Sequence, residues 1–387
     1  MNSKDSRRLR IGITCFATFG GSGIVATEVG LAMAKRGHQV HFIARALPIR
    51  LDPTTENVFF HAVAEPDNAV LQPDGAYPIA LASKMIEISQ QFQLDLLHVH
   101  YAVPHATAAW LACQVLGKKA PKLVTTLHGT DITLVGNDAT YLPITRFSVL
   151  KSDAVTVPSQ FLREATYREL DLPRTMPIDV VQNFIDTEAW RPQQQRNREI
   201  LRPHFSDLQS DEAILIHISN LRPLKRISDV VAIFQKVNAV RPTRLVLIGE
   251  GPQKQLAQNL LRQAGLEDRT AFLGHCDRVA TYLGAADVFL LTSETESFGL
   301  AALEAMSCGI PVVSSDVGGL PEVVAHGETG FWAPMGDVAQ MADYTLDLLG
   351  DAAKWQRFSA RARQRVLSLF TAAPAVDAYE AVYRLVL

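Results

Sequence analysis

The sequence predicts an α/β protein with two doubly wound, Rossmann-like domains that face a central cleft. Short apolar runs of strand length alternate with helix-forming stretches along the chain, a pattern typical of parallel sheets covered on both faces. The same pattern begins again after a polar stretch near the middle, as expected for a second domain. The 387 residues are enough for two or three domains with cores of their own.

Composition excludes several classes of protein. The chain has 37 Lys and Arg against 40 Asp and Glu, with no polybasic tract, so we expect no nucleic-acid partner. Apolar runs stay well short of the roughly 18 residues of a membrane span, and the polar, basic start of the chain does not predict a signal peptide. The four cysteines are scattered, which indicates reduced thiols. We expect a cytoplasmic protein without stable membrane association, and a homo-oligomer is left open.

Five apolar runs are the predicted strands of the first half. Helix-forming stretches follow from Ile24, Ala80 and Ala106. Ligands of doubly wound sheets bind beyond the carboxyl ends of the strands, so residues directly after a strand are candidates for a site. The predicted strands are residues 9–15, 38–44, 95–99, 122–127 and 154–158.

A glycine-rich loop follows the first predicted strand. The run from Gly21 through Ser22 and Gly23 to Ala26 fits the G-x-G-x-x-A dinucleotide fingerprint. The second strand ends at Arg45 instead of an acid, which argues against NAD and leaves NADP open. Backbone amides and the Ser22 hydroxyl also suit an anion, and a tight turn for packing is the alternative interpretation.

Three histidines lie close together at the end of the 95–99 strand and just after it, at positions 98, 100 and 105. A strand places His98 and His100 on one face, but no acid or cysteine lies nearby as a third ligand, so we predict no metal site. Tyr101 lies where the strand meets its loop. Its hydroxyl could reach a ligand, and packing is an equal alternative.

His128 directly follows the 122–127 strand and precedes Gly129, a place from which it could donate to a substrate oxygen. We favour this role over that of a buried structural histidine because Thr130 and Asp131 cluster beside it. Arg146 falls in a helical stretch with apolar neighbours. It either pairs with an internal acid or receives an anionic ligand, and the sequence leaves both open.

A polar run, residues 191–198, marks a linker between the domains. We place the boundary near Thr187, which gives domains of 1–187 and 188–372. The alternating pattern then repeats. The predicted strands of the second half are residues 214–218, 244–248, 270–273, 288–291 and 310–313.

Cations and glycines follow the first strands of this second half. Arg222, Lys225 and Arg226 come after the 214–218 strand, where they suit a diphosphate; solvated surface charge is the alternative. Tight turns at Gly249 and Gly251, and a turn at 274–275 that includes His275, follow the next two strands. Each of these signals is weak alone, and together they mark one edge of a sheet.

Glu296 and Glu304 stand eight residues apart after the 288–291 strand, where the chain turns polar, passes Gly299 and becomes helical. If most of this interval is helical, the two carboxylates are ~12 Å apart along the axis, about the distance from sugar to ribose in an extended nucleotide-sugar. Amides at the helix start could hold the diphosphate. A solvated loop acid and a surface acid are the alternative, but Glu304 lies among apolar residues, which favours function.

The motif E-S-F-G-L-x-x-L-E, preceded by A-D-V-F-L-L and followed by G-I-P-V-V, resembles the family-four retaining glycosyltransferases of GT-B fold, and the resemblance covers the whole chain. Further segments are similar to members that transfer N-acetylglucosamine from UDP-N-acetylglucosamine to L-malate in bacillithiol biosynthesis. These segments are G-I-T-C, G-G-S-G, H-Y-A-V-P-H-A, T-T-L-H-G-T-D-I-T, N-F-I-D, S-N-L-R-P-L-K-R and S-F-G-L.

The resemblance implies site residues and their roles. Glu304 would bind the ribose, Glu296 the sugar hydroxyls, Lys225 the diphosphate and His128 the donor sugar, with His128, Lys225 and Glu296 as catalytic residues. The implied acceptor contacts are Gly21, Ser22, Tyr101, Thr126 and Arg146. The predicted donor contacts, from this resemblance and from positions after strands, are Gly23, Asn220, Arg222, Lys225, Arg226, Gly249, Gly251, His275, Glu296, Ser297, Phe298, Gly299, Leu300 and Glu304.

Two further expectations follow from the resemblance. Asn220 stands where the wider family has an arginine, so either Arg222 or Arg226 supplies that charge. The resemblance also implies that a carboxy-terminal helix, about residues 373–387, packs back on the first domain.

No D-x-D motif follows a strand, whereas Lys225 and neighbouring arginines are available. We therefore expect a reaction without metal or other cofactor, in which cations stabilise the leaving diphosphate. The family retains the anomeric configuration, and no acid here is an obvious nucleophile. We therefore favour attack by the acceptor hydroxyl from the same face as the one from which the leaving group departs. Three rivals remain: a transferase with an inositol phosphate, lipid or sugar acceptor, a nucleotide-sugar epimerase, and an NADP-dependent oxidoreductase.

Overall fold

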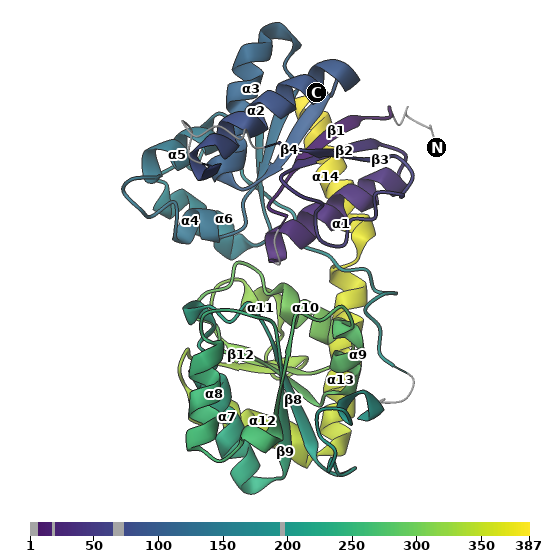
Figure 1. Cartoon of the computed structure of the whole chain (residues 1–387), viewed down its shortest axis with the longest axis vertical. Helices are drawn as coiled ribbons and strands as arrows, with labels where there is room; N and C mark the ends of the chain where they lie inside the picture. Colours follow the sequence, from purple (N-terminus) through teal and green to yellow (C-terminus); the bar gives the residue numbers. More distant parts are fainter. Residues whose placement is uncertain (1–6, 18–19, 65–72, 194–197) are drawn as a thin grey trace. The chain divides into compact units, whose positions relative to one another are not determined.

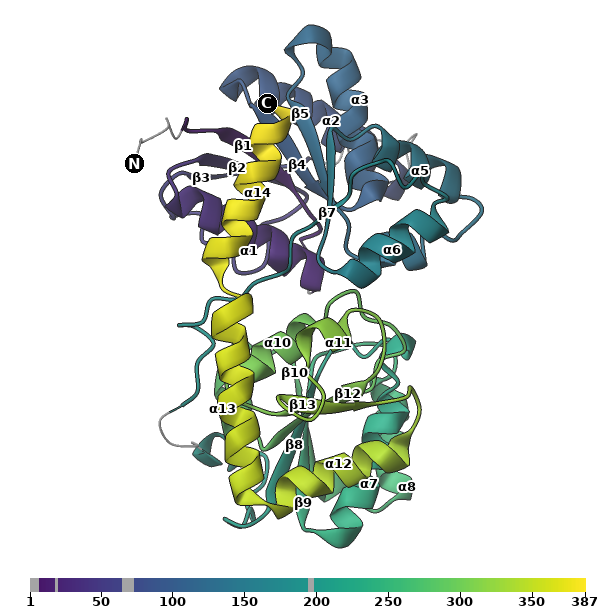
Figure 2. The same cartoon turned by 180° about the vertical axis from the view of Figure 1, so that it is seen from behind.

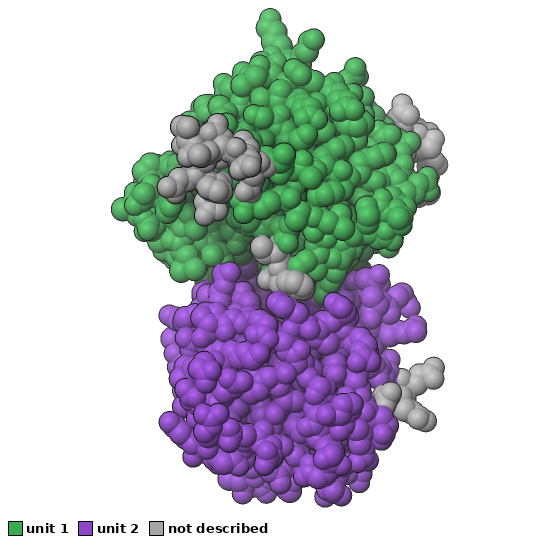
Figure 3. All heavy atoms as spheres, viewed as in Figure 1, with its two compact units in different colours: residues 1–184, 372–387 green, residues 185–371 purple. Residues whose placement is uncertain are grey.

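The computed structural model describes residues 7–17, 20–64, 73–193 and 198–387; part of the predicted linker, 194–197, lies outside them. The chain divides into two compact units, Met1–Phe184 with Ala372–Leu387 and Ile185–Thr371 (Figure 3). Each unit contains one parallel sheet with helices against it (Figure 1). The predicted fold class of two doubly wound α/β domains is therefore confirmed.

The sheet of the first unit has the order β3-β2-β1-β4-β5-β6-β7, and its strands pair in parallel. The chain order reverses between β1 and β4, which is where doubly wound sheets bind their ligands. The strands are β1 (Arg10–Thr14), β2 (Gln39–Ala44), β3 (Val58–Ala62), β4 (Leu96–His100), β5 (Lys122–Thr126), β6 (Ala154–Val157) and β7 (Asp179–Val180).

The helices of this unit lie on both faces of its sheet. The longer ones are α1 (Gly21–Lys35), α2 (Pro73–Phe92), α3 (Thr107–Leu116), α5 (Leu142–Leu150), α6 (Gln160–Glu169) and α14 (Ala372–Val386). Short helical turns are α4 (Thr130–Thr133), η1 (Ala102–Ala106) and η2 (Gly117–Lys119).

Alternation along β4 explains why both faces are covered. Leu97 and Val99 join the apolar core formed with α2 and α3. His98 and His100 point to the opposite face, where the carboxy-terminal helix α14 lies against the sheet (Figure 2). On α14, Tyr379 and Tyr383 are fully buried, and the Tyr383 hydroxyl lies 2.8 Å from His98 Nδ1.

The sheet of the second unit has the order β10-β9-β8-β11-β12-β13 and is also parallel. Its strands are β8 (Ala213–Ile218), β9 (Thr243–Ile248), β10 (Thr270–Gly274), β11 (Val288–Leu291), β12 (Val312–Ser315) and β13 (Gly330–Ala333). Its helices are α7 (Ile227–Val240), α8 (Lys254–Gln263), α9 (Val279–Ala285), α10 (Leu300–Ser307), α11 (Leu320–Val323), α12 (Val338–Gly350) and α13 (Ala352–Leu369), with short turns η3 (Arg198–Leu201), η4 (Pro223–Lys225) and η5 (Glu267–Arg269).

Two apolar cores sandwich this second sheet. Ile214 and Ile216 face the core that includes α9, α10 and part of α13. Leu215 lies between them in the sequence and faces the core built with α7, α8 and α12. Strands that are buried on both faces read as continuous apolar runs, which is why the sequence predicted them.

The structure adds strands that the sequence did not predict and shifts one that it did. β3 and β13 are edge strands; β3 is largely half-exposed, and β13 begins at a glycine. The strand predicted at 310–313 begins at Val312 because the Ile310 amide donates to the Ala305 carbonyl and so finishes helix α10. Across the described ranges, no helix is long and apolar enough to cross a membrane.

Candidate active site

Lys225 and Glu296 meet at the carboxyl edge of the second sheet, although they are 71 residues apart in the sequence. Lys225 Nζ donates to Glu296 Oε1 across 2.5 Å, and the Ser293 hydroxyl donates to the same oxygen across 2.7 Å. The two charged side chains are only 16% and 14% exposed. The structure therefore brings together two of the three predicted catalytic residues as a largely buried ion pair.

Backbone contacts fix the two loops that carry this ion pair. The loop after β8 and the loop after β11 join where the Glu294 amide donates to the Leu224 carbonyl across 2.7 Å. The Thr292 hydroxyl donates to the Lys225 carbonyl across 3.0 Å. β8 and β11 are neighbours in the sheet, so their carboxyl ends place the loops side by side.

A glycine pair after β12 holds the backbone of Glu296. Gly318 has a φ of +60°, and a Cβ there would lie 1.9 Å from the Glu296 carbonyl oxygen. The Gly319 amide donates to that same oxygen across 2.8 Å. Neither glycine was predicted as a site residue, although a Gly-Gly pair after a predicted strand is a signal of close backbone approach.

Helix α10 begins between the two acids, so it covers only the second part of the interval from Glu296 to Glu304. Gly299 is its N-cap with a φ of +101°, and the helix starts at Leu300. The interval from Glu296 to Glu304 is therefore helical only from Leu300 onward, so the axial estimate of their separation describes that part and not residues 296–299. Because the N-cap residue has no side chain, it leaves the first amides of the helix open to a ligand.

Glu304 is buried in the second turn of α10 at 6% exposure. Cys308 lies one turn further along. Burial, together with the Glu304 charge, raises the pKa of its thiol to about 12. A buried carboxylate on the helix that follows Glu296 fits the predicted grip on a nucleotide-sugar.

Two predicted donor glycines lie in close contact with the backbone of the loop after β8. A Cβ on Gly249 would lie 1.9 Å from the Ser219 carbonyl oxygen, and a Cβ on Gly251 would lie 2.0 Å from that of Asn220. The Asn220 Oδ1 atom is buried and has no hydrogen-bond partner among the residues that the structure describes. These glycines thus shape the loop that carries the predicted diphosphate contacts.

The two arginines that could replace the family arginine differ in their surroundings. Arg226 Nε donates to Asp229 across 2.7 Å, and this bond raises the pKa of the arginine. Arg222 is exposed. His275, a further predicted contact, is exposed after β10.

His217 is a buried residue of this site that was not predicted from the sequence. Its Nδ1 lies 2.9 Å from the Leu290 carbonyl, so Nδ1 carries the proton, and its Nε2 accepts from the Ser219 hydroxyl across 2.8 Å. Burial lowers the pKa of His217 to about 4. At neutral pH it is an uncharged imidazole that links Leu290 of β11 to Ser219 in the loop after β8.

In the first unit, the carboxyl edge of the sheet gathers predicted residues around His128. His128 Nε2 lies 2.8 Å from Nδ1 of His100, and the ring of Tyr101 stacks on His128 at 5.7 Å. Burial lowers the pKa of His128 to about 3. Three amides donate to the Asp131 carboxylate, those of Ala102, His128 and Gly129, so Asp131 ties the ends of β4 and β5 together.

Other predicted acceptor residues have protein partners of their own. The Thr126 hydroxyl lies 2.7 Å from His98 Nε2 and 2.6 Å from the Thr156 hydroxyl, on the face covered by α14. Arg146 pairs at 3.3 Å with Asp171, a side chain that is 92% exposed. The acid beside Arg146 is therefore a surface residue and not an internal one.

The glycine-rich loop forms the first turn of α1. The helix begins at Gly21, and Gly21 is exposed, Ser22 partly exposed and Gly23 buried. The buried Gly23 carbonyl accepts from the Thr27 hydroxyl across 2.9 Å. Arg45, considered for an NADP phosphate, lies over the ring of Tyr77 at 4.8 Å.

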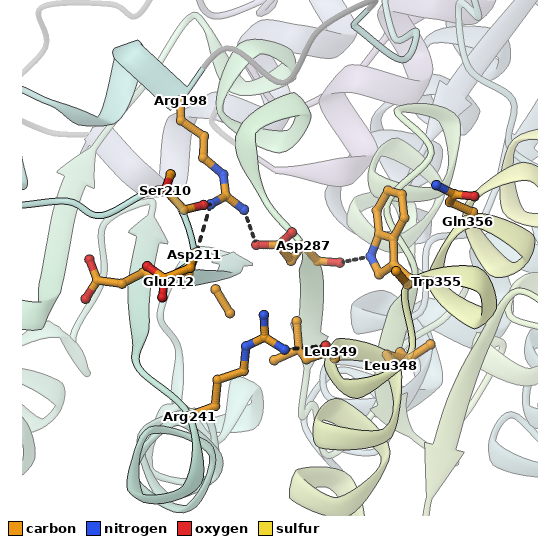
Figure 4. Close-up of a pocket in the computed structure, with 12 residues that line it drawn as sticks. Arg198, Ser210, Asp211, Glu212, Arg241, Asp287, Leu348, Leu349, Trp355 and Gln356 are labelled. Atoms are coloured by element: carbon orange, nitrogen blue, oxygen red, sulfur yellow. Dashed lines mark hydrogen bonds and ion pairs between the residues drawn. The ribbon is translucent and has the colours of Figure 1, made fainter.

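A separate cavity of about 420 Å³ lies at the opposite, amino-terminal edge of the second sheet (Figure 4). Arg198 donates there to Asp287 and to two carbonyls, Arg241 donates to the Leu349 carbonyl, and the Trp355 indole donates to the Asp287 carbonyl. Its charged groups thus stabilise the seam between α12, α13 and the strand starts.

Within the described ranges no group of three or more His, Cys, Asp or Glu could hold a metal ion, and metal independence stays a prediction.

Comparison with known proteins identifies the class of this two-unit α/β chain. The model described as Glycosyltransferase Family 4 matches residues 19–189, and the model described as Glycosyl transferases group 1 matches residues 202–365. A Bacillus anthracis relative is 44% identical over 376 residues, 97% of each chain. The chain therefore belongs to glycosyltransferase family 4.

That relative is N-acetyl-alpha-D-glucosaminyl L-malate synthase. D-inositol 3-phosphate glycosyltransferase of Mycolicibacterium smegmatis is 28% identical over 94% of this chain and 86% of its own. Two solved structures share the fold. They are sucrose-phosphate synthase from Thermosynechococcus elongatus, at 22% identity and a TM-score of 0.80 over 98% and 99% of the two chains, and Anabaena HepE in complex with UDP-glucose, at 19% identity and a TM-score of 0.80 over 97% and 99%.

Proposed function

We propose that this chain transfers N-acetylglucosamine from UDP-N-acetylglucosamine to the hydroxyl of L-malate, with retention at the anomeric carbon and release of UDP. The Bacillus anthracis relative that is named for this activity supports the proposal, since it is 44% identical over almost the whole chain. The Lys225–Glu296 pair at the carboxyl edge of the second sheet is the structural observation that carries it. In this proposal the Lys225 cation meets the diphosphate and the Glu296 carboxylate meets the sugar.

On the donor side, this proposal gives roles to a few residues of the second unit and to the start of α10. Glu304 binds the ribose, and the first amides of α10 lie against the diphosphate. Lys225 stabilises the charge that develops on the leaving UDP, and Glu296 binds the sugar hydroxyls. Arg222 is the better replacement for the family arginine because Arg226 is already engaged by Asp229.

Chemically, the proposed transfer needs no metal or other cofactor. The bond from the anomeric carbon to the diphosphate breaks, and the electron pair leaves with UDP beside Lys225. The malate hydroxyl attacks from the same face, and its proton passes to a diphosphate oxygen. No covalent intermediate is required, and orientation of the two substrates supplies much of the rate.

On the acceptor side, L-malate brings two carboxylates, so its site needs cations or aimed donors. The predicted contacts are the amides of Gly21 and Gly23, Ser22, Tyr101 and Arg146. Thr126 is the fifth contact, but its hydroxyl already has two protein partners, so Arg146 and the start of α1 carry more of this proposal. A planar guanidinium can pair with a carboxylate through two hydrogen bonds.

A different acceptor is the second candidate. Relatives at 28% identity are D-inositol 3-phosphate glycosyltransferases, which supports an inositol phosphate as the alternative. Membership of the glycosyltransferase family leaves no support for an oxidoreductase. A cytoplasmic location stays a prediction, as does a homo-oligomer.

The deciding experiment is to incubate the protein with UDP-N-acetylglucosamine, with and without L-malate, and to measure UDP release. We expect release that depends on malate, and a product in which the sugar keeps its anomeric configuration by NMR. A matched incubation with D-inositol 3-phosphate tests the second candidate. Release with inositol phosphate alone would refute the malate assignment and keep the donor assignment.

A further inference from the structure

Two histidine rings from neighbouring strand ends face each other in the first unit. Nδ1 of His100, the last residue of β4, lies 2.8 Å from Nε2 of His128, which follows β5. The ring planes are 25° apart. Two facing imidazole nitrogens form a hydrogen bond only when one carries a proton and the other does not. This contact therefore couples the tautomers of the two rings.

A third ring has a tautomer that geometry fixes. His105 Nδ1 lies 2.5 Å from the backbone oxygen of His100, and a carbonyl can only accept, so Nδ1 carries the proton. Burial lowers the pKa of His105 to about 4, so its Nε2 is bare at pH 7. Nε2 of His100 and Nε2 of His105 are both buried without a hydrogen-bond partner in the described part of the chain.

Two proton arrangements are possible between His100 and His128. If His128 donated, His100 would accept at Nδ1 and keep its own proton on Nε2, which would leave a buried N–H without an acceptor among the described residues. If His100 donates, its unpartnered Nε2 is only a lone pair. Buried N–H groups without a partner are the rarer and costlier case. The second arrangement leaves no ring N–H of His100 or His105 unpaired.

We infer that His100 is a positioning residue that holds His128 in its Nδ1–H tautomer and thereby makes His128 a hydrogen-bond donor to an oxygen of the bound sugar. The identity of that oxygen rests on the proposed function, whereas the tautomer does not. His128 is partly exposed, and no described residue hydrogen-bonds its Nδ1. A neutral donor suits a sugar hydroxyl because it adds no cation to the site.

Surrounding contacts hold the His128 ring in this direction. The His128 amide donates to Asp131 Oδ1 across 3.1 Å, which anchors the backbone. The Tyr101 ring stacks on the imidazole with planes 19° apart. With its backbone and one ring face held, the ring has a single nitrogen left to offer, and His100 decides what that nitrogen carries.

Two substitutions at one position separate the two nitrogens of His100. In His100→Asn, the side-chain amide reaches the place of Nδ1 and can still donate to His128. In His100→Gln, the amide reaches the place of Nε2, and the bond to His128 is lost. Both variants remove the imidazole and its stacking, so each is the control for the other.

The first readout is the tautomer itself. Protein with ¹⁵N-labelled histidine, at pH 7 and without substrate, gives long-range ¹H–¹⁵N correlations that distinguish the two neutral forms, and His128→Gln assigns the His128 signals. We expect the proton of His128 on Nδ1 in the wild type and in His100→Asn, and a mixture or the Nε2–H form in His100→Gln. A wild-type His128 with its proton on Nε2 would overturn the inference.

The second readout is kinetic. Loss of an aimed donor commonly lowers kcat by about 10²–10³, and a mixture of tautomers keeps part of the function, so we expect kcat of His100→Gln to fall by roughly 10- to 100-fold. His100→Asn should keep most of kcat, and both variants should keep the wild-type UDP affinity. Equal losses in both variants with an unchanged tautomer would make His100 merely structural. If the wild type transfers nothing to malate, the proposed function fails, and the NMR result still decides the tautomer.

Discussion

The ammonium group of Lys225 and the carboxylate of Glu296 lie 2.5 Å apart, and both side chains are largely buried. Neither group has to be ordered when a substrate binds, because loop backbone contacts already hold both. Only one Glu296 oxygen is engaged by Lys225 and Ser293. We infer that the pair is a preformed recognition element, in which the cation meets the diphosphate and the carboxylate meets the sugar.

The two carboxylates should have separable effects on binding. Glu304→Ala should weaken UDP and UDP-N-acetylglucosamine alike, because ribose is common to both, and the loss of a hydrogen bond to a charged group costs about 1.5–3 kcal/mol. Glu296→Ala should lower kcat and leave the UDP affinity close to wild type. Isothermal titration with UDP checks both variants. Equal losses of UDP affinity would contradict this division of roles.

Lys225 should be needed for turnover, and added metal should not. Lys225→Ala should lower kcat by ~10²–10³, the usual effect of removing one group that stabilises developing negative charge. Wild-type activity should survive an excess of EDTA. The matched control is Lys254→Ala, since Lys254 is a cation of the same unit whose partner is Glu250. Activity that disappears with EDTA and returns with Mg²⁺ would refute metal independence.

Arg146 offers a test of the acceptor site. Arg146→Lys should raise KM for malate strongly, because lysine cannot form a two-pronged pair with a carboxylate. Its pair with Asp171 is a surface ion pair of low energy, so thermal stability should hardly change. Asp171→Asn is the control and should keep the wild-type KM and Tm. A fall in Tm that parallels the loss of activity would instead favour a structural role for Arg146.

Gly318 should tolerate no side chain. In Gly318→Ala, the new Cβ would collide with the Glu296 carbonyl at 1.9 Å, so the loop has to move and Glu296 with it. We expect a lower kcat and a lower Tm. Gly327→Ala is the control, since its φ of +73° carries similar backbone strain but no atom lies within 4 Å of the new Cβ. Equal effects of the two substitutions would show that strain alone is responsible.

The first unit should lose stability on mild acidification. Burial lowers the pKa of His98 and His128 to about 3 and of His105 to about 4, while unfolded histidine titrates near pH 6.5. The unfolded chain therefore takes up more protons below pH 6.5, and each histidine costs about 2 kcal/mol of stability between pH 7 and pH 5. Asp131 acts in the opposite direction, because burial raises its pKa to about 6 and its stabilising effect grows as the pH falls through that value.

Urea unfolding at pH 7 and pH 5 measures this effect. Trp110 is the one tryptophan of the first unit, so a protein with phenylalanine at positions 190, 332 and 355 reports on that unit by fluorescence. We expect a lower midpoint at pH 5. His98→Asn removes one buried imidazole and should reduce the difference between the two midpoints. Unchanged midpoints across this range would mean that the histidines are not held neutral.

The sequence predicted the central strands well and the edges of the sheets poorly, for a physical reason. β11 is buried on both faces, so its residues form an apolar run that is visible without the fold. β3 at the edge of its sheet has mixed burial and no such run. Similarly, Ile310 is apolar because it packs in a core, yet its amide finishes α10 instead of starting β12.

Individual site residues were predictable from their positions after strands, but their contacts were not. Lys225 and Glu296 lie on loops that meet only because β11 is inserted beside β8, an order that the chain does not reveal locally. His217 looked like one more strand residue, and the Gly318–Gly319 turn acts only through the loop that it touches. Local patterns indicated the chemistry, whereas the sheet order determined which groups meet.

Helix α14 has a consequence for how the protein is made. Its residues Tyr379 and Tyr383 are buried against the first unit, but they follow the whole second unit in the sequence. While the chain emerges from the ribosome, the second unit has its entire sequence available before the first unit receives its final helix. The first unit is thus completed only after the second, and a nascent chain stalled before α14 would expose the sheet face that this helix covers.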